Sequence, residues 1–261
     1  MLLFSLFSIA SANFAFAEKN TAEVTLNKDD VSVAVKVAGK LFTKYVYNDE
    51  KRAKPILYPV IGPNDIPMTR RYPIEGAGKG EAKDHPHHAS LWYTHGEVNG
   101  ISFWHIGKDT GEIIHEKFLK LKGNVIATRN KWVDSKGKVV CRDERELAFH
   151  GEGDDRAIDV TIKILADSGD VTFGDTKEGS MGIRSNPVLR LKGSVAKGKA
   201  LNSAGDTDKA LWGKRAAWVS YWAPQEKKVV GFSIFDHPTN PRHPTWWHAR
   251  DYGLVAANPF G

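Results

Sequence analysis

The sequence contains a single cysteine, Cys141, so no disulfide bond can form within the chain. A chain of 261 residues buries about 70–75% of its extended surface on folding, so a hydrophobic core alone can stabilise it. Cys141 lies in a strand-like run, and we expect it to be buried as a small hydrophobic side chain. For an exported protein, the lack of disulfides is compatible with a bacterial periplasm.

Several catalytic signatures are missing as well. The sequence has no glycine-rich phosphate loop, no G-x-S-x-G nucleophile elbow, no H-E-x-x-H motif and no cysteine pair for a metal. These absences disfavour nucleotide-dependent enzymes and α/β-hydrolases. The net charge is +6, but the basic residues are scattered, so we expect no nucleic-acid partner. An anionic polysaccharide partner and a merely solvated basic surface both stay open.

Only the first seventeen residues form a long apolar run. Residues 1–17 carry no charge and end in Ala15-Phe16-Ala17, an A-x-A cleavage pattern that Glu18 follows at once. We interpret this run as a secretory signal peptide that lacks the usual basic start. A membrane anchor is the alternative, but the run is shorter than the roughly 20 residues that a span needs. The sequence therefore predicts a periplasmic or extracellular protein with no membrane span.

Helical periodicity is absent from every long segment. Residues 158–164 alternate apolar and polar side chains, which predicts a half-buried strand. Similar runs, joined by Gly- and Pro-containing turns, predict further strands. They lie at residues 31–37, 125–133, 139–149, 218–222 and 229–235. The sequence thus predicts an all-β, antiparallel β-sandwich in one domain, residues 18–261, with at most a helical turn or two within 204–212.

Histidines are present in two dense stretches, residues 85–96 and 236–248. Seven of the ten histidines lie there among prolines and tryptophans: His85, His87, His88, His95, His237, His243 and His248. Both stretches fall in or beside long irregular segments, 51–89 and 237–252, which we expect to be loops that carry function. A polar site with aromatic walls of this kind is suited to proton transfer, to metal binding or to sugar binding.

Three interpretations of these histidines stay open. His85 and His87 would point to one side of an extended segment, which suits a divalent metal, and His237 is a further candidate ligand. His88 would face the other way unless Pro86 bends the segment. Hydrogen bonding within a polar loop and acid–base catalysis without metal are the other two interpretations. No cofactor is implied with certainty.

A third segment, residues 173–184, adds carboxylates and an arginine. Asp175 and Glu178 could act as an acid, a base or metal ligands, while Arg184 follows two glycines. A charged hairpin tip is the alternative. Arg242 beside His243 could bind a carboxylate or sulfate through its planar fork, with Arg184 and Arg250 as weaker candidates for the same role. Trp92 and Trp246 offer flat apolar faces on which a sugar ring could stack.

Three blocks in order carry a family resemblance. They are His85-Pro86-His87-His88 with Leu91-Trp92 and His95-Gly96-Glu97; Gly174-Asp175-Thr176-Lys177-Glu178-Gly179 with Gly182-Ile183-Arg184; and Asp236-His237-Pro238 with Asn240-Pro241-Arg242-His243-Pro244, Trp247-His248 and Asn258-Pro259-Phe260-Gly261. The chain resembles the bacterial family labelled methane oxygenase PmoA, a domain of unknown function. The membrane subunit of particulate methane monooxygenase is helical and spans the membrane several times, so the resemblance implies no such enzyme.

The resemblance implies carbohydrate handling, because family members occur in exported proteins of bacteria that degrade complex polysaccharides. The β pattern with histidines is similar to the galactose mutarotase-like supersandwich, as an analogy of fold alone. Members of the family continue past Gly261 into a final strand. A C-terminally truncated chain is therefore one interpretation of this sequence.

We therefore expect an exported enzyme that transfers protons on a sugar or oligosaccharide, by hydrolysis, elimination or epimerisation. His88 and His248 would be its acid and base, with Glu178 as a carboxylate partner. The expected substrate-binding residues are Trp92, His95, Arg184, Asp236, Arg242, His243 and Trp246. A non-catalytic glycan-binding module and a metal-dependent enzyme are the alternatives, and the sequence indicates no oligomeric state. The central expectation is that all three segments meet at one site.

Overall fold

The computed structural model describes residues 22–225 and 228–261, so the expected signal peptide at residues 1–17 lies outside the described residues. An eight-stranded sheet dominates the fold. In spatial order its strands are β1 (Val24–Lys28), β2 (Ser32–Val37), β3 (Lys40–Val46), β4 (Ile56–Val60), β5 (Leu91–His95), β10 (Gly179–Arg184), β15 (Leu254–Asn258) and β14 (Trp246–Ala249).

Two smaller sheets complete the strands. One contains β6 (Glu112–Lys122), β7 (Val125–Val133), β8 (Val139–Glu152) and β9 (Asp155–Leu165); the other contains β11 (Lys199–Asn202), β12 (Trp218–Gln225) and β13 (Lys228–Phe235). The helical turns are η1 (Pro63–Asp65), η2 (Pro187–Leu189) and η3 (Asp208–Leu211). No helix among the described residues has the length and apolar character needed to cross a membrane.

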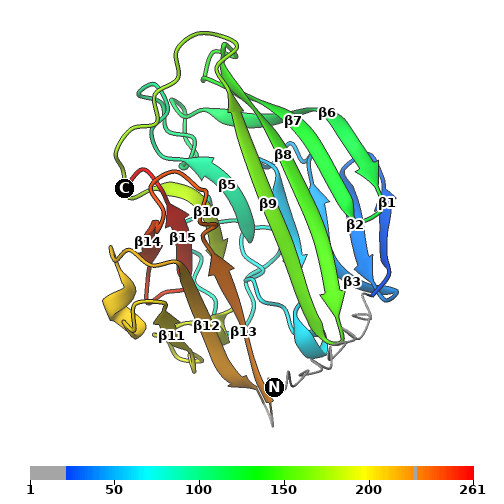
Figure 1. Ribbon diagram of the computed structural model, residues 1–261, viewed down its shortest axis with the longest axis vertical. Helices are drawn as coiled ribbons and strands as arrows, with labels where there is room; N and C mark the ends of the chain where they lie inside the picture. Colours follow the sequence, from blue (N-terminus) through cyan, green and yellow to red (C-terminus); the bar gives the residue numbers. More distant parts are fainter. Residues whose placement is uncertain (1–21, 226–227) are drawn as a thin grey trace, which may run out of the picture.

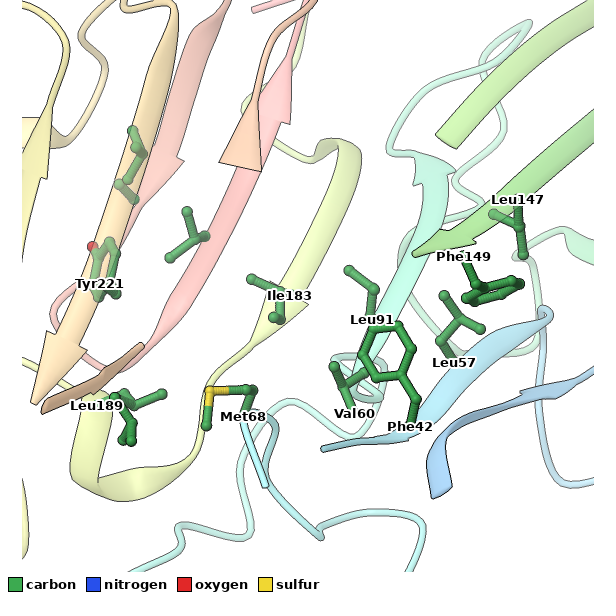
Figure 2. Close-up of a cluster of buried hydrophobic side chains, with 14 of the residues drawn as sticks. Phe42, Leu57, Val60, Met68, Leu91, Leu147, Phe149, Ile183, Leu189 and Tyr221 are labelled. Carbon is green, nitrogen blue, oxygen red and sulfur yellow. The ribbon is translucent and has the colours of Figure 1, made fainter. Parts of the chain in front are cut away.

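The sheets form two layers, with the two smaller sheets packed against the eight-stranded one (Figure 1). One large core fills the space between the layers. Figure 2 shows Ile183 of β10 and Leu91 of β5 in this core, with Tyr221 of β12 to one side and Phe149 of β8 to the other. The prediction of an antiparallel β-sandwich is therefore confirmed. The likeness to the mutarotase supersandwich stays a prediction.

The strands next to the site each have a core face and an outer face, because side chains alternate along a strand. Ile183 pairs with Val255 of β15, and both point into the core. One residue away, a cross-strand row turns to the outer face. The row runs Trp92, Gly182, Ala256 and His248 across β5, β10, β15 and β14.

The outer face of the eight-stranded sheet holds a second apolar cluster that includes Trp92, Trp104, Leu254 and Ala256. The two small residues of the row make space for the indoles above them. A Cβ atom on Gly182 would lie 2.7 Å from Cζ2 of Trp92 and 3.3 Å from Cη2 of Trp104. A larger side chain at position 182 would therefore displace both tryptophans.

Most predicted strands are present, and the differences have a local cause. The hairpin across residues 134–138 joins β7 to β8, and residues 218–222 pair with 229–235 as expected. However, β4 lies inside the first expected loop and β14 inside the second. β4 is apolar at every position and nearly all buried, so it has no period-two pattern to detect. Residues 179–184 form a central strand rather than a hairpin tip.

Candidate functional site

His88 is the centre of a polar cluster on the outer face of the eight-stranded sheet, with only 2% of its surface exposed. Nε1 of Trp104 lies 3.2 Å from Nε2 of His88, and Nη1 of Arg184 lies 3.0 Å from Nδ1. Both neighbours are obligate donors, whereas a neutral imidazole accepts at only one nitrogen, so one donor at a time can be satisfied.

Burial, followed by the positive charges that His87 and Arg184 can carry, lowers the pKa of His88 far below its usual range. The ring is therefore held neutral at pH 7, and it has no imidazolium proton to donate.

A tight turn at residues 85–88 brings the histidines together. His88 N donates to the carbonyl of His85 at 2.9 Å, so the segment bends at Pro86 rather than running extended. The rings of His85 and His88 consequently stack in parallel, with centroids 4.8 Å apart. Tyr252 stacks on the other side of His85 at 5.3 Å, and Trp92 lies nearly parallel to His88 at 5.5 Å. These four rings form one column.

His87 lies beside this column and contacts the rings of His88 at 4.4 Å and His105 at 4.8 Å. Burial, followed by the neighbouring charges of His105 and Lys54, lowers the pKa of His87 to about 3. Among the described residues, no group of three or more His, Cys, Asp or Glu side chains is arranged to hold a metal ion.

Asp84 fixes the orientation of His85. Its carboxylate lies 2.7 Å from Nη1 of Arg70, 2.9 Å from Nη2 of Arg184 and 3.0 Å from Nδ1 of His85. Burial alone would raise the pKa of Asp84, but the charge of Arg184 and hydrogen bonds from both arginines hold it well below its usual value.

An ionised carboxylate only accepts hydrogen bonds, so Nδ1 of His85 is the protonated nitrogen. Nε2 of the same ring is left as an acceptor. The side chain of His85 is 42% exposed, so the ring is accessible from the surface.

His248 and Glu178 form a second pair of imidazole and carboxylate. Nδ1 of His248 is buried without a hydrogen-bond partner and lies 3.8 Å from Oε2 of Glu178. Burial is the main cause that lowers the pKa of His248 to about 4, while the charge of Glu178 opposes the shift. His248 is therefore neutral at pH 7. Glu178, with 15% of its side chain exposed, is the outward member of the pair, and Lys177 Nζ lies 2.9 Å from its Oε1.

The two pairs are joined by a closed circuit of side-chain contacts. From the column, Trp104 contacts the ring of His88 at 5.5 Å and that of His248 at 6.4 Å. On the other side, Trp212 contacts His248 at 4.8 Å. Arg250 then links Trp212 to Tyr252. We call this set the outer-face cluster; it comprises Asp84, His85, His87, His88, Trp92, Trp104, Glu178, Arg184, Trp212, His248, Arg250 and Tyr252.

Most of the second histidine stretch builds a loop of its own. Asp236 is buried and accepts hydrogen bonds from Nδ2 of Asn240 at 2.8 Å, Nδ1 of His243 at 2.7 Å and the backbone N–H of Thr245 at 2.9 Å. His237 bonds to Thr239 within the same loop. These contacts hold the loop together, and the burial of Asp236 keeps its carboxylate from being presented to a ligand.

Trp246 and Arg242 lie beside this loop. The guanidinium of Arg215 stacks on Trp246 at 4.4 Å and donates to the carbonyl of Arg242 at 3.1 Å. In the part of the chain that the structure describes, no hydrogen bond, ion pair or ring contact joins residues 236–246 to the outer-face cluster. Of the three segments expected to meet, residues 85–88, residues 178–184 and His248 come together, and residues 236–246 do not.

His95 also lies apart from the cluster and supports it. Its Nε2 bonds to the carbonyl of Gly174 at 2.8 Å and its Nδ1 lies 3.3 Å from Oγ of Ser180. The ring is buried, and burial lowers its pKa. His95 thereby fastens the segment that presents Glu178 to strand β5.

Several members of the cluster were not singled out from the sequence. Asp84 directly precedes His85, and that adjacency of acid and histidine was the available signal. Tyr252 stands just after the second stretch, in the turn that follows β14. Trp212 is remote from every motif and carries no sequence signal. Its position depends entirely on how the η3 turn packs against β14.

The geometry defines a class of protein: an antiparallel β-sandwich that carries a histidine-rich polar cluster on the outer face of its largest sheet. The chain belongs to a family of unknown function, DUF6807, whose model matches residues 32–261 and so covers the whole outer-face cluster. No curated protein and no solved structure shows a significant match to the chain.

Proposed function

We propose that this protein is an exported enzyme that transfers protons on a carbohydrate at the outer-face cluster. One observation carries the proposal: two imidazoles that each lie beside a carboxylate are on the same sheet face within one circuit of contacts. Nδ1 of His85 is 3.0 Å from Asp84, and Nδ1 of His248 is 3.8 Å from Glu178, too far for a hydrogen bond. Reactions at a sugar commonly need one group that accepts a proton and another that donates one. The signal-peptide pattern of residues 1–17 supports the exported location.

Exposure separates the two members of each pair. His85 and Glu178 reach the surface, so we assign them as the residues that exchange protons with the substrate. Asp84 fixes the tautomer of His85, which leaves Nε2 as the base. His248 is buried, and we assign it a positioning role toward Glu178 rather than direct contact with the substrate.

His88 contributes by fixing the geometry of its neighbours. It stacks on His85, accepts from Trp104 or Arg184, and cannot become an imidazolium readily, since burial and positive neighbours oppose its charge. We therefore assign His88, which the sequence suggested as an acid or base, a positioning role as well.

The aromatic side chains of the cluster supply a surface for a sugar ring. Trp212 is 40% exposed, and Tyr252 is half-buried beside it across Arg250. Flat apolar faces with polar edges suit the C–H faces and hydroxyl groups of a pyranose. Trp92, in contrast, is buried beneath His88 and serves as packing.

The test compares Glu178→Gln and His85→Gln with the wild-type protein and with His150→Gln. His150 pairs with Asp159 at 2.9 Å on the remote four-stranded sheet, so it is a matched imidazole–carboxylate control. The substrates are oligomers of neutral galactan, sulfated galactan and polygalacturonate. New reducing ends report hydrolysis, ultraviolet absorbance of unsaturated ends reports elimination, and NMR reports epimerisation.

We expect the Glu178 and His85 variants to lose roughly 10²- to 10⁴-fold in kcat, as is typical when a general acid or base is removed, and His150→Gln to keep the wild-type rate. Turnover that survives in both variants, with melting curves unchanged, would contradict the assignment.

A non-catalytic glycan-binding module is the second candidate. The ladder of the exposed Trp212 with the half-buried Arg250 and Tyr252 favours it, because such a surface can bind sugars without any proton transfer. Binding of an oligomer by wild type, Glu178→Gln and His85→Gln alike, with no conversion in any of them, would select this candidate.

A further inference from the structure

The guanidinium of Arg250 stacks against two aromatic rings. Its Cζ lies 4.9 Å from the ring centroid of Trp212 and 5.7 Å from that of Tyr252. Among the described residues, no hydrogen bond or ion pair engages its guanidinium. The stacking restricts the plane of the group while its N–H donors stay free. A guanidinium in this state is prepared to bind an oxyanion such as a carboxylate or a sulfate group through two parallel N–H donors.

The other arginines of the described chain show that this state is unusual. With the exception of Arg242, each of them donates a side-chain hydrogen bond to a carboxylate or a carbonyl. They are Arg52, Arg70, Arg71, Arg129, Arg142, Arg145, Arg156, Arg184, Arg190 and Arg215. Arg242 is exposed in the second stretch and stacks on no ring that the structure describes, so water solvates it freely.

The charge around Arg250 is not balanced by the protein. Asp84 is shared among Arg70, Arg184 and His85, and Glu178 is paired with Lys177. The adjacent Asp251 lies 3.6 Å from Nζ of Lys209. Each of these three carboxylates thus has a cation of its own, and none of them forms an ion pair with Arg250. A half-buried cation without a counter-charge favours an anionic ligand, because the ligand supplies the missing partner.

Arg250 is also placed beside the proposed proton-transfer groups. It follows His248 by two residues at the end of β14, and both contact the indole of Trp212. The backbone N–H of Arg250 donates to the carbonyl of Leu254, and the backbone N–H of Gly253 donates to the carbonyl of Arg250. The tight turn into β15 therefore fixes the backbone from which the guanidinium extends.

We propose that the carbohydrate bound at the outer-face cluster is acidic, and that Arg250 binds its carboxylate or sulfate group. This inference rests on the proposed function, since it names the class of sugar that the same site takes. Trp212 and Tyr252 stack on the sugar and orient the guanidinium at once. Glu178 and His85 would then lie on either side of the bound unit.

The test measures binding rather than turnover, so its failure can be told apart from failure of the proposed enzyme. Affinities are determined by calorimetry for oligomers of matched length: polygalacturonate, sulfated galactan and neutral galactan. The variants are Arg250→Gln, which removes the charge, and Arg250→Lys, which keeps the charge but loses the planar fork. Arg156→Gln is the matched control, because Arg156 bonds only to carbonyls of its own hairpin.

We expect wild type to bind at least one acidic oligomer more tightly than the neutral one. Arg250→Gln should weaken that binding roughly ten- to a hundredfold, the usual effect of losing a charge-assisted hydrogen bond in binding, and Arg250→Lys should weaken it less. Binding of neutral galactan and the behaviour of Arg156→Gln should not change. The comparison of the two acidic oligomers identifies whether the group is a carboxylate or a sulfate.

Three results would overturn the inference. One is equal affinity of wild type for neutral and acidic oligomers; another is unchanged acidic binding in Arg250→Gln with an unchanged melting curve; the third is binding of none of the oligomers. Acidic binding that depends on Arg250 without any turnover would keep this inference and refute the enzyme. Turnover of the neutral oligomer alone would do the reverse.

Discussion

The two histidine stretches look alike in sequence and behave differently in the structure. In the first, His85, His87 and His88 pack against one another and against Trp104, and Arg184 from the distant strand β10 bonds to both His88 and Asp84. In the second, the carboxylate of Asp236 accepts hydrogen bonds only from residues that follow it by at most nine positions. The first stretch is therefore assembled by the tertiary fold, and the second by its own loop.

This difference shows what a count of histidines leaves out. A histidine that bonds to a carboxylate in its own loop fixes local backbone, and it can do so in any fold. A histidine with partners from distant strands depends on the whole sandwich and so marks a place where separate segments were brought together. His248 makes the point, because it belongs to the second stretch by sequence and to the first by its contacts.

The largest expected effect on stability, and so the strongest test of this comparison, is at Arg184. Arg184→Met leaves the ionised Asp84 with less compensation and removes a partner of His88, so we expect the free energy of unfolding to fall by about 3–5 kcal/mol. Urea denaturation measures the loss. The matched control is Arg129→Met on the half-exposed pair with Glu144, which should cost at most about 1 kcal/mol. Equal losses of unfolding free energy in the two variants would show that the contacts of the first stretch contribute no more to stability than an ordinary half-exposed ion pair.

The corresponding change in the second stretch is Asp236→Ala. It leaves the buried backbone N–H of Thr245 without its acceptor, so we expect a loss of about 1–3 kcal/mol in unfolding free energy. Glycan binding at the outer-face cluster should stay at the wild-type level. A loss of binding in a folded Asp236→Ala protein would show that the two stretches are functionally coupled after all.

The stability of the folded protein should fall in acid, because His88 in the first stretch and His248 are buried and neutral. Burial lowers the pKa of His248 from 6.5 to about 4, and it lowers the pKa of His88 as well. Below pH 6.5 these histidines therefore bind protons in the unfolded chain but not in the folded one. The free energy of unfolding has its full value above pH 6.5 and falls as the pH is lowered.

For each of these two histidines the loss should be about 1.4 kcal/mol per pH unit between pH 6.5 and about pH 5. Denaturation at several pH values measures the slope, and His248→Gln should make it shallower. A slope that His248→Gln leaves unchanged would contradict the assignment of a buried neutral ring.

The smallest effect is expected at His237. This side chain is exposed and bonds only to Thr239 within its loop. His237→Ala should therefore change the free energy of unfolding by no more than about 0.5 kcal/mol, with binding of every oligomer intact. Loss of glycan affinity in this variant would place the second stretch at the site and reverse the comparison.

The fold could be predicted further than the site. Period-two runs such as residues 158–164 and the turn at 134–138 are local signals, and the structure contains both elements. β4 has no such signal because it is buried on both faces. The parallel stack of His85 and His88 depends on the turn at Pro86, and Trp212 reaches His248 only through tertiary packing. No spacing in the sequence encodes those contacts.

Gly182 and Ile183 are neighbours in the chain, but their side-chain positions lie on opposite faces of the sheet and have different roles. Ile183 fills the core between the layers, whereas Gly182 leaves space for two indoles of the outer-face cluster, those of Trp92 and Trp104. The same alternation runs through β14 and β15, where Trp247 and Val255 face inward and His248 and Ala256 face outward. In evolutionary terms, these strands separate folding from chemistry residue by residue. A lineage could change what the outer face recognises by substituting every second position, while the intervening residues preserved the protein that carries it.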